Sequence, residues 1–443
     1  MTALGSACPA HPRGVISRLN FITPATESLG LWPVIRSGSF MRFLLAAIAV
    51  TAGLFLFENT LFWEAIRVTG STGFVSLVLA SILAPLPLLI MKVGSWTDRV
   101  GPRPLLLTSL LAWIATMVGA ALFTGRDGAS GPLLLALGIC DGVCTAVWIV
   151  PSQVMLGRVV PAGLMATAIG LGGLQFAAGR IIGGLAAANL IQVVGTRPTF
   201  AVAATLVGVG GLAMLGVKGH PAAWRAPAAQ LPAKARDAFN WLRRDAEAVV
   251  LILMGPAIGV FAFTYLAVLP GVSRYVLHAG SEGLGLMTAA GGAGIGLTAL
   301  LADSLGRRYG RGRLLFVAVG TGASALVLLG LSSNLAASVL LAGVLSGSLT
   351  LYTSVNNMLL QALAPPEMRG RVLAMYGLGF WAVLPFGSLL IGWSVDHAGA
   401  RSVLEAMGVL TLSTVGCVLL TDTRLWRLDI GPDGAVTSRR PGA

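Results

Sequence analysis

Apolar stretches recur along most of the chain and are separated by short polar segments. A helix of about 20 apolar residues crosses a hydrocarbon core of about 30 Å, and each of these stretches is long enough to do so. The pattern therefore predicts an all-α integral membrane protein with twelve transmembrane helices. The predicted spans are 43–66, 73–92, 104–123, 132–151, 168–191, 198–217, 249–270, 283–301, 314–333, 335–358, 373–394 and 402–421.

A longer polar segment between the sixth and seventh spans divides the chain into two halves. It contains Pro221, Pro227 and Pro232 with several Lys and Arg residues, which is typical of a linker. Its stretch AKARDAFNWLRRDAEA can form a basic amphipathic helix on an anionic membrane surface, and a solvated connector is the alternative. The predicted parts are an N-terminal tail (1–40), a six-helix bundle (41–217), the linker (218–248), a second six-helix bundle (249–421) and a C-terminal tail (422–443).

A charged loop motif follows the second span of each half. The first loop motif is VGSWTDRVGPRPLLL (93–107) and the second loop motif is ALLADSLGRRYGRGRLL (299–315). Two six-helix bundles with corresponding loops are the signature of a secondary transporter built from parallel repeats. The matched pairs are Asp98 and Asp303, Gly101 and Gly306, and Arg103 and Arg308, each 205 positions apart.

Composition agrees with a chain that lies mainly in lipid, because only 11% of residues are charged and the mean hydropathy is +0.84. When the spans alternate sides, 24 of the 30 Lys and Arg residues fall on the side of the termini, 5 fall on the other side, and Arg180 lies within a span. The positive-inside rule then predicts a multi-pass protein of the inner cell membrane with both termini cytoplasmic. The net charge of +13 follows from this topology, so we expect the lipid bilayer and no nucleic acid as partner. The oligomeric state is left open, and a monomer is plausible.

An enzyme embedded in the membrane is the competing class of protein. It would need a base, a nucleophile or a metal site at membrane depth, yet His11, His220, His278 and His397 all lie in predicted tails or loops. The four Cys residues form no disulfide framework, and the chain has no Walker-type nucleotide motif. We therefore expect no catalysis, no cofactor and no metal. Transport of a substrate against its concentration gradient would have to be driven by an ion gradient.

Three ionisable residues are expected at membrane depth, away from the ends of their spans, namely Glu58, Asp141 and Arg180. A charge at the bilayer centre costs about 2.5 to 3.5 kcal/mol on insertion scales, so each is expected to be functional or paired. Glu58 and Asp141 lie at matched depth, about 14 Å below the outer ends of their helices. They are either a proton-coupling pair or part of a static ion-pair network with Arg180 as counter-charge. Two acids against one base leave at least one acid able to exchange a proton.

Polar and aromatic side chains at membrane depth are candidates for a substrate cavity. Span ten is polar along SGSLTLYTSVNN, and aromatic residues lie in spans one, seven and eleven. Such a lining suits a small amphiphilic organic molecule, and ordinary helix packing is the alternative reading. The candidates are Phe62, Trp63, Tyr265, Tyr352, Asn356, Asn357 and Trp381.

The first loop motif resembles the loop motif of the major facilitator superfamily, Gly-x-x-x-Asp-Arg-x-Gly-Arg-Arg. The second loop motif has Ala299 and Ser304 where the family pattern has Gly and Arg. The segments LAVLPGVSRYVLHAGSEGLGLMTAAGGAGIG and QALAPPEMRGRVLAMYGLGFWAVLPFGSLLIGW resemble the branch with the enterobactin exporter and macrolide-efflux-type permeases. The positions that match the loop motif are Gly94, Asp98, Arg99, Gly101 and Arg103.

The resemblance implies a proton-coupled exporter of a siderophore or drug-like compound that works by alternating access. Helices one, four, seven and ten of the superfamily line its cavity, which would place Glu58 and Asp141 there. It further implies a gating latch, a contact of the loop motifs across the inner ends of the two halves, with Arg369 or Arg371 as the partner region. The alternative is that the charges of these loops only set the topology. A nutrient importer or facilitator and a lipid flippase of the same fold are the alternatives.

Overall fold

The computed structural model describes residues 38–124, 129–160, 165–217, 235–365, 368–421, 424–430 and 436–438. Residues 1–37 of the predicted N-terminal tail and 218–234 of the predicted linker lie outside the described residues. The same holds for 422–423, 431–435 and 439–443 of the predicted C-terminal tail.

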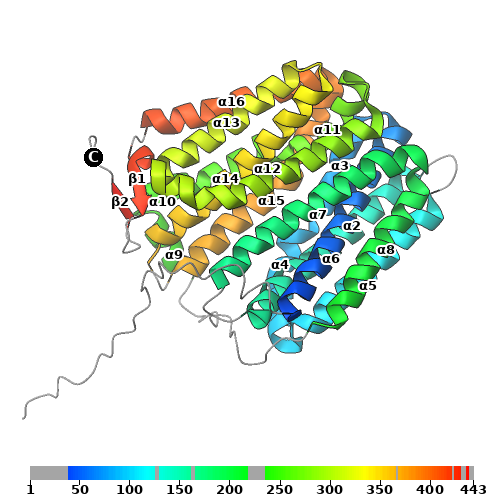
Figure 1. Cartoon of the computed structure of the whole chain (residues 1–443). Coiled ribbons are helices and arrows are strands. Elements are labelled where there is room, and N and C mark those ends of the chain that lie inside the picture. Colours follow the sequence, from blue (N-terminus) through cyan, green and yellow to red (C-terminus); the bar gives the residue numbers. More distant parts are fainter. Residues whose placement is uncertain are drawn as a thin grey trace, which may run out of the picture.

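The described residues contain twelve helical segments that are long and apolar enough to cross a membrane, which confirms the predicted fold class. They form two bundles that lie side by side (Figure 1). The N-terminal bundle consists of α2 (Gly38–Thr69), α3 (Thr72–Leu83), α4 (Pro85–Val100), α5 (Pro102–Phe123), α6 (Gly131–Val159), α7 (Met165–Val193) and α8 (Thr196–Leu215). The C-terminal bundle consists of α10 (Ala246–Ala262), η2 (Phe263–Ala267), α11 (Leu269–Gly271), η3 (Val272–Val276), α12 (Gly280–Tyr309), α13 (Arg311–Leu331), α14 (Leu335–Leu363), α15 (Arg369–Ala398) and α16 (Ala400–Thr421).

Two of the spans are not continuous α-helices. The second span divides into α3 and α4 at Pro85, which has no backbone N–H to continue the helical ladder. The seventh span passes from α10 through the 3₁₀ segment η2 to the π-helical segment η3. Such local departures from α-helix are tolerated at membrane depth where protein or a cavity surrounds the backbone.

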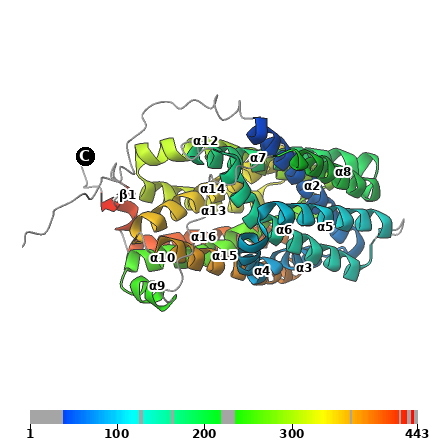
Figure 2. The same ribbon diagram turned by 90° about the horizontal axis from the view of Figure 1, so that it is seen from below.

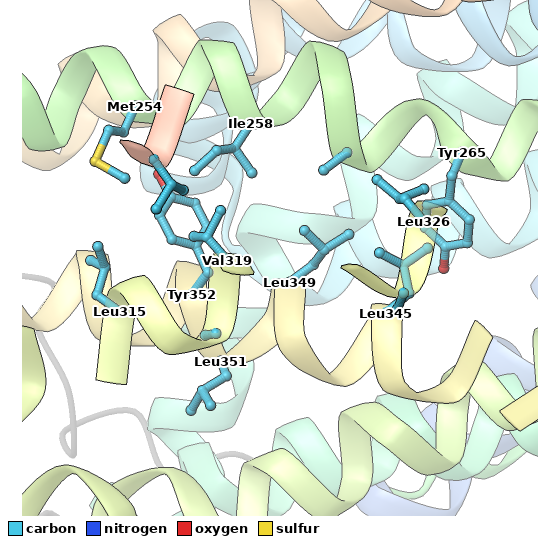
Figure 3. Packing of buried hydrophobic residues seen from close by; sticks show 14 of the residues in the cluster. Met254, Ile258, Tyr265, Leu315, Val319, Leu326, Leu345, Leu349, Leu351 and Tyr352 are labelled. Carbon is cyan, nitrogen blue, oxygen red and sulfur yellow. The ribbon is translucent and has the colours of Figure 1, made fainter. Parts of the chain in front are cut away.

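Each bundle has its own apolar core. In the N-terminal core, α2 packs against α7 and α8 around fully buried side chains such as Phe57, Leu61 and Phe200. In the C-terminal core, α10, α13 and α14 contribute residues such as Ile258 and Leu349, which interdigitate in Figure 3. Since lipid is as apolar as these side chains, close packing rather than exclusion of water holds the helices together.

The two bundles meet along α7 and α12 on one side and along α3 and α15 on the other (Figure 2). The α7–α12 contact depends on glycine. A Cβ atom on Gly184 would lie 2.8 Å from the carbonyl oxygen of Gly285 and 2.7 Å from the nitrogen of Ala289, closer than real Cβ atoms approach. The helices therefore touch backbone to backbone, as small residues in membrane interfaces permit.

The predicted linker contains one described helix, α9 (Ala235–Leu242). Leu242 is buried and Trp241 packs against the C-terminal core, whereas Phe239 is exposed beneath the guanidinium of Arg243. The amphipathic stretch is thus helical over part of its length, with one end held by the C-terminal bundle.

The C-terminal bundle extends beyond residue 421, where the sequence predicted a tail. The segment η4 (Leu425–Arg427) continues into strand β1 (Leu428–Ile430), which pairs antiparallel with β2 (Val436–Ser438). Leu425 and Leu428 are buried, and Trp426 packs on Phe316 of α13 with ring centroids 5.9 Å apart. The sequence pattern gave no sign of this segment because its strands are too short to show an alternation.

The predicted register of the internal repeat differs from the observed one by one helical turn. Gly101 ends α4 with φ of 90°, a left-handed conformation that favours glycine. In the second half the corresponding residue is Gly310, which ends α12 with φ of 87°, while Gly306 is inside the helix. Asp303 therefore lies one turn deeper in its helix than Asp98, although their sequence motifs look alike.

The predicted topology can be tested by cysteine labelling. After replacement of the native cysteines, Ser130→Cys on the loop before α6 is expected to react with an impermeant thiol reagent only from outside. Asn240→Cys on α9 is expected to react only from inside, because positively charged segments stay cytoplasmic. Both residues are exposed. Reaction of either cysteine from the opposite side alone would overturn the topology.

Candidate functional site

A cavity of about 660 Å³ lies between the two bundles. It is bounded by α2, α3, α5, α6 and α7 of the N-terminal half and by η2, α12, α14 and α15 of the C-terminal half. Most of its surface is apolar, as in pockets that bury organic molecules. The aromatic side chains that line it include Phe55, Phe62, Trp113, Trp148, Phe176, Phe263 and Trp381.

The cavity is closed at one end by hydrogen bonds between the halves. Arg274 Nη1 donates to the carbonyl oxygen of Ile66 over 2.8 Å, and the Tyr275 hydroxyl donates to that of Gly70 over 2.7 Å. At the other end its lining reaches Phe40 near the start of α2. Under the predicted topology the closed end is the outer one, so the cavity faces the cytoplasm.

Glu58 and Asp141 have different surroundings. Glu58 is half-buried, lines the cavity and has no hydrogen bond or ion pair with any described residue. Asp141 is fully buried and lies outside the cavity lining, where its Oδ1 accepts a 2.8 Å hydrogen bond from Trp113 Nε1. Its Oδ2 has no partner among the described residues. The expectation that both acids line the cavity is therefore right for Glu58 only; Asp141 contacts the cavity wall through Trp113.

Arg180 joins the two halves. Its Nη2 donates to the Tyr265 hydroxyl over 3.2 Å, and that hydroxyl is 2.6 Å from Ser346 Oγ. The guanidinium also lies over the Phe55 ring, 5.5 Å from its centroid. No carboxylate of the described residues is within ion-pair distance of Arg180, so this conformation contains no static ion pair between it and either acid.

The predicted cavity residues fall into two groups. Phe62, Tyr265 and Trp381 line the cavity. Trp63 instead packs against both bundle cores. Tyr352 points away from the cavity into the C-terminal core, between Met254 and Val319 in Figure 3.

The two asparagines of α14 are also outside the cavity lining. Asn356 is buried and its Nδ2 donates to the Leu251 carbonyl over 3.4 Å. Asn357 donates to the Thr353 carbonyl of its own helix over 2.8 Å. The polar stretch of α14 covers more than one helix face, and only the face with Ser346, Leu349 and Thr350 reaches the cavity.

Two polar contacts were missed by the sequence reasoning. Thr288 of α12 donates to Asn59 of α2 over 2.8 Å, which joins the halves one residue from Glu58. Glu64, which the sequence reasoning did not count among the charges at depth, is fully buried and pairs with Arg67 at 2.7 Å. The spacing of three residues between Glu64 and Arg67 on one helix was the available signal.

The first loop motif makes no ion pair with a described residue of the other half. Asp98 and Arg99 are exposed, and Gly94 is half-buried. Arg103 Nη2 donates to the carbonyl oxygen of Leu215 at the end of α8, over 2.7 Å, which ties α5 to its own bundle.

The second loop motif is held within its own half. Asp303 pairs with Arg307 and lies 3.8 Å from Arg311, which in turn lies 3.6 Å from Asp429. Arg308 covers the Tyr309 ring at 5.4 Å from its centroid.

The region predicted to receive the latch lies at the start of α15. Arg369 Nε donates to the Ala364 carbonyl over 3.3 Å, and Arg371 is half-buried. Neither residue pairs with Asp98 among the described contacts. The contacts of the predicted latch are therefore absent among the described residues in this conformation.

Two six-helix bundles around a central cavity define a membrane transporter of the major facilitator type. The family model described as transmembrane secretion effector matches residues 29–432. The chain belongs to this family of the major facilitator superfamily. No curated protein matches the chain significantly.

Solved structures share the fold at low sequence identity. The nucleoside transporter NupG superposes with a TM-score of 0.67 at 14% identity, covering 86% of this chain and 98% of its own. A bacterial homolog of the human lysosomal transporter Spinster, inward-facing and unoccupied, gives 0.66 at 15% identity with coverage of 88% and 98%. A D-xylose–proton symporter gives 0.62 at 17% identity with coverage of 89% and 99%.

Proposed function

We propose that this transporter exports an amphiphilic organic compound, siderophore or drug-like, in exchange for protons. The observation that carries the proposal is a largely apolar, aromatic-lined cavity between the bundles with a carboxylate on its wall, Glu58, that has no ion-pair partner among the described residues. The family description as a secretion effector supports the outward direction.

The cavity lining favours an organic substrate over an inorganic ion. An ion would need several converging oxygen ligands, whereas most of the wall here consists of aromatic and aliphatic side chains. A few hydroxyl and amide groups, such as those of Thr51, Gln175 and Thr350, can orient a substrate of mixed polarity. Tyr265 and Arg180 add a polar contact that spans both halves.

Proton coupling is assigned to Glu58, with Asp141 as its neighbour. Glu58 lies within electrostatic reach of Asp141 and Arg180. An ionised carboxylate in a dry cavity is costly, and a protonated one is not, so the proton on Glu58 changes which conformation is favoured. Uptake of a proton from outside and its release inside would then drive substrate outward.

Asp141 would affect the cavity indirectly. Its ionised form accepts the hydrogen bond from Trp113, whose ring forms part of the cavity wall beside Trp148. A change in the charge of Asp141 would therefore change the strength of the hydrogen bond that positions an aromatic wall residue. This links the second acid to substrate binding without direct contact.

Transport of defined probes tests the proposal. Inside-out vesicles from overexpressing cells would receive an imposed pH gradient, acidic inside, and one of three fluorescent amphiphiles: ethidium (cationic), anilinonaphthalene sulfonate (anionic) or Nile red (neutral). Gradient-dependent accumulation of at least one probe, absent in vesicles without the protein, is expected. Accumulation of none of these probes, together with gradient-dependent uptake of sugars or nucleosides by intact cells, would favour an importer.

The gating latch is tested by a matched pair of substitutions. Asp98→Asn is expected to reduce transport by about tenfold, because a carboxylate that closes on a helix end contributes about 1 to 2 kcal/mol. Asp303→Asn is expected to have a smaller effect, since Asp303 pairs only within its own half. Initial rates in vesicles, normalised to expression, provide the measurement, and wild-type rates for Asp98→Asn would refute the latch.

A further inference from the structure

A carboxylate from one half caps a helix of the other half at the closed end of the cavity. Asp396, near the end of α15, accepts a 2.7 Å hydrogen bond from Ser71 Oγ and a 2.9 Å hydrogen bond from the backbone N–H of Gly73. Ser71 is the N-cap of α3, and its hydroxyl oxygen also accepts from the Phe74 N–H. Both oxygens of Asp396 thus meet the positive end of α3, where free N–H groups and the helix dipole favour an anion.

The backbone is shaped for this contact. A Cβ atom on Gly73 would collide with the Asp396 carboxylate. A Cβ atom on Gly392, one turn earlier on α15, would collide with Ser76 of α3. Glycine at both positions lets the two helices approach until the carboxylate reaches the first turn of α3.

The residues around Asp396 repeat the first loop motif on the opposite face of the molecule. The sequence DRVGPR (98–103) ends α4, and DHAGAR (396–401) ends α15. In both copies the glycine three residues after the aspartate ends the helix with positive φ, 90° at Gly101 and 83° at Gly399. The last residue of each copy anchors the next helix, since Arg401 donates to Ser333 over 2.7 Å as Arg103 does to Leu215.

The two copies occupy opposite ends of one antiparallel pair. The second span runs from Thr72 to Val100 and carries Asp98 at its far end, while α15 runs the other way and carries Asp396 at its far end. Each aspartate is near the end where the partner span begins. In the described conformation Asp396 is bonded to the start of α3, and Asp98 has no partner among the described contacts.

We propose that Asp396 is a gating residue of the transport cycle: it holds the outer gate closed by capping α3 and releases it when the first loop motif closes the inner end. The two aspartates then act in alternation. Each one stabilises a different conformation. The difference between the free energies of the two contacts therefore influences the ratio of inward-facing to outward-facing molecules.

Outer accessibility of the cavity tests this without a substrate or a proton gradient. In a chain without native cysteines, Phe62→Cys places a thiol on the cavity wall. Its rate of reaction with an impermeant reagent from outside reports the outward-facing population. Asp396→Asn is expected to raise that rate by about tenfold, because it removes the anion from the helix end. Asp245→Asn, the same change on an aspartate that caps α10 within its own half, is the control and is expected to leave the rate within about twofold, since Asn caps a helix as well as Asp.

Two further variants separate the contact from general damage. Gly73→Ala keeps the carboxylate but displaces it, and is expected to raise the outside rate in the same direction. Adding Asp98→Asn to Asp396→Asn weakens both ends and is expected to return the rate toward that of the parent chain. Outside labelling at the parent rate in both Asp396→Asn and Gly73→Ala, in protein that elutes as a folded species, would overturn the proposal. An increase that the added Asp98→Asn leaves unchanged would also contradict the alternation.

Discussion

Glu58→Gln is expected to abolish gradient-driven accumulation of substrate while downhill exchange continues. Gln preserves the size and polarity of the side chain, so the cavity remains, but it cannot take up or release a proton. If Glu58 carries the coupling proton, accumulation should fall by at least about 100-fold, because an imposed gradient then has no differential effect on the two conformations. The measurement is uptake into proteoliposomes with and without a pH gradient, using a probe that the wild-type protein accumulates.

Asp141→Asn is the companion variant. The amide oxygen can still accept the hydrogen bond from Trp113, so the wall of the cavity is kept and only the charge is removed. We expect the same loss of gradient-driven accumulation. Trp113→Phe, which keeps the acid but removes the donor, is expected to alter probe affinity more than coupling. Undiminished accumulation in both carboxylate variants would place the coupling site elsewhere in the cavity.

Gly285→Ala is expected to cause a large loss of folded protein. The new Cβ would lie 2.5 Å from the backbone nitrogen of Ala188 and 2.5 Å from the carbonyl oxygen of Gly184, and backbone atoms cannot rotate away as a side chain can. Overpacking of this kind lowers the free energy of unfolding by about 1 to 3 kcal/mol or more. Here it would push α7 and α12 apart, and these helices form the most extensive contact between the bundles.

The matched control is Gly119→Ala on α5, where a Cβ atom would meet nothing within 4 Å. This change is expected to be neutral or slightly stabilising, since Ala favours helix over Gly by about 1 kcal/mol. Thermal unfolding of detergent-purified protein, followed by loss of the monodisperse elution peak, measures the difference. Equal stability of the two variants would show that α7 and α12 can move apart without cost.

The sequence predicts the membrane architecture well because hydropathy is a property of each span alone. Twelve apolar stretches and a polar division between halves predict the two bundles directly. The breaks in the second and seventh spans were missed because proline is common in membrane helices, and only tertiary packing decides whether a helix divides at it. The second span divides at Pro85, whereas α10 continues through Pro256 and changes to a 3₁₀ segment only at Phe263.

Prediction of the site was less complete because it depends on helix rotation. The sequence places Tyr352 and Asn356 at cavity depth, but their side chains face the C-terminal core. It also places Asp141 at the depth of Glu58, without showing that Trp113 lies between it and the cavity. Asp396 escaped notice because it lies at the end of a span, where a carboxylate is ordinary, and its partner is 325 positions away.

The packing of residues 424–430 has a consequence for biogenesis. Gly312, at the start of α13, lies so close to the C-terminal segment that a Cβ atom on it would collide with the carbonyl oxygens of Leu425 and Leu428, which the ribosome adds more than one hundred positions later. Until that segment is synthesised, the surface of the C-terminal bundle around Phe316 lacks its contact with Trp426. Residues 424–430 are translated after all twelve spans and cover part of the surface of α13. A premature stop just after Thr421 would therefore yield all twelve spans but leave that surface of α13 uncovered.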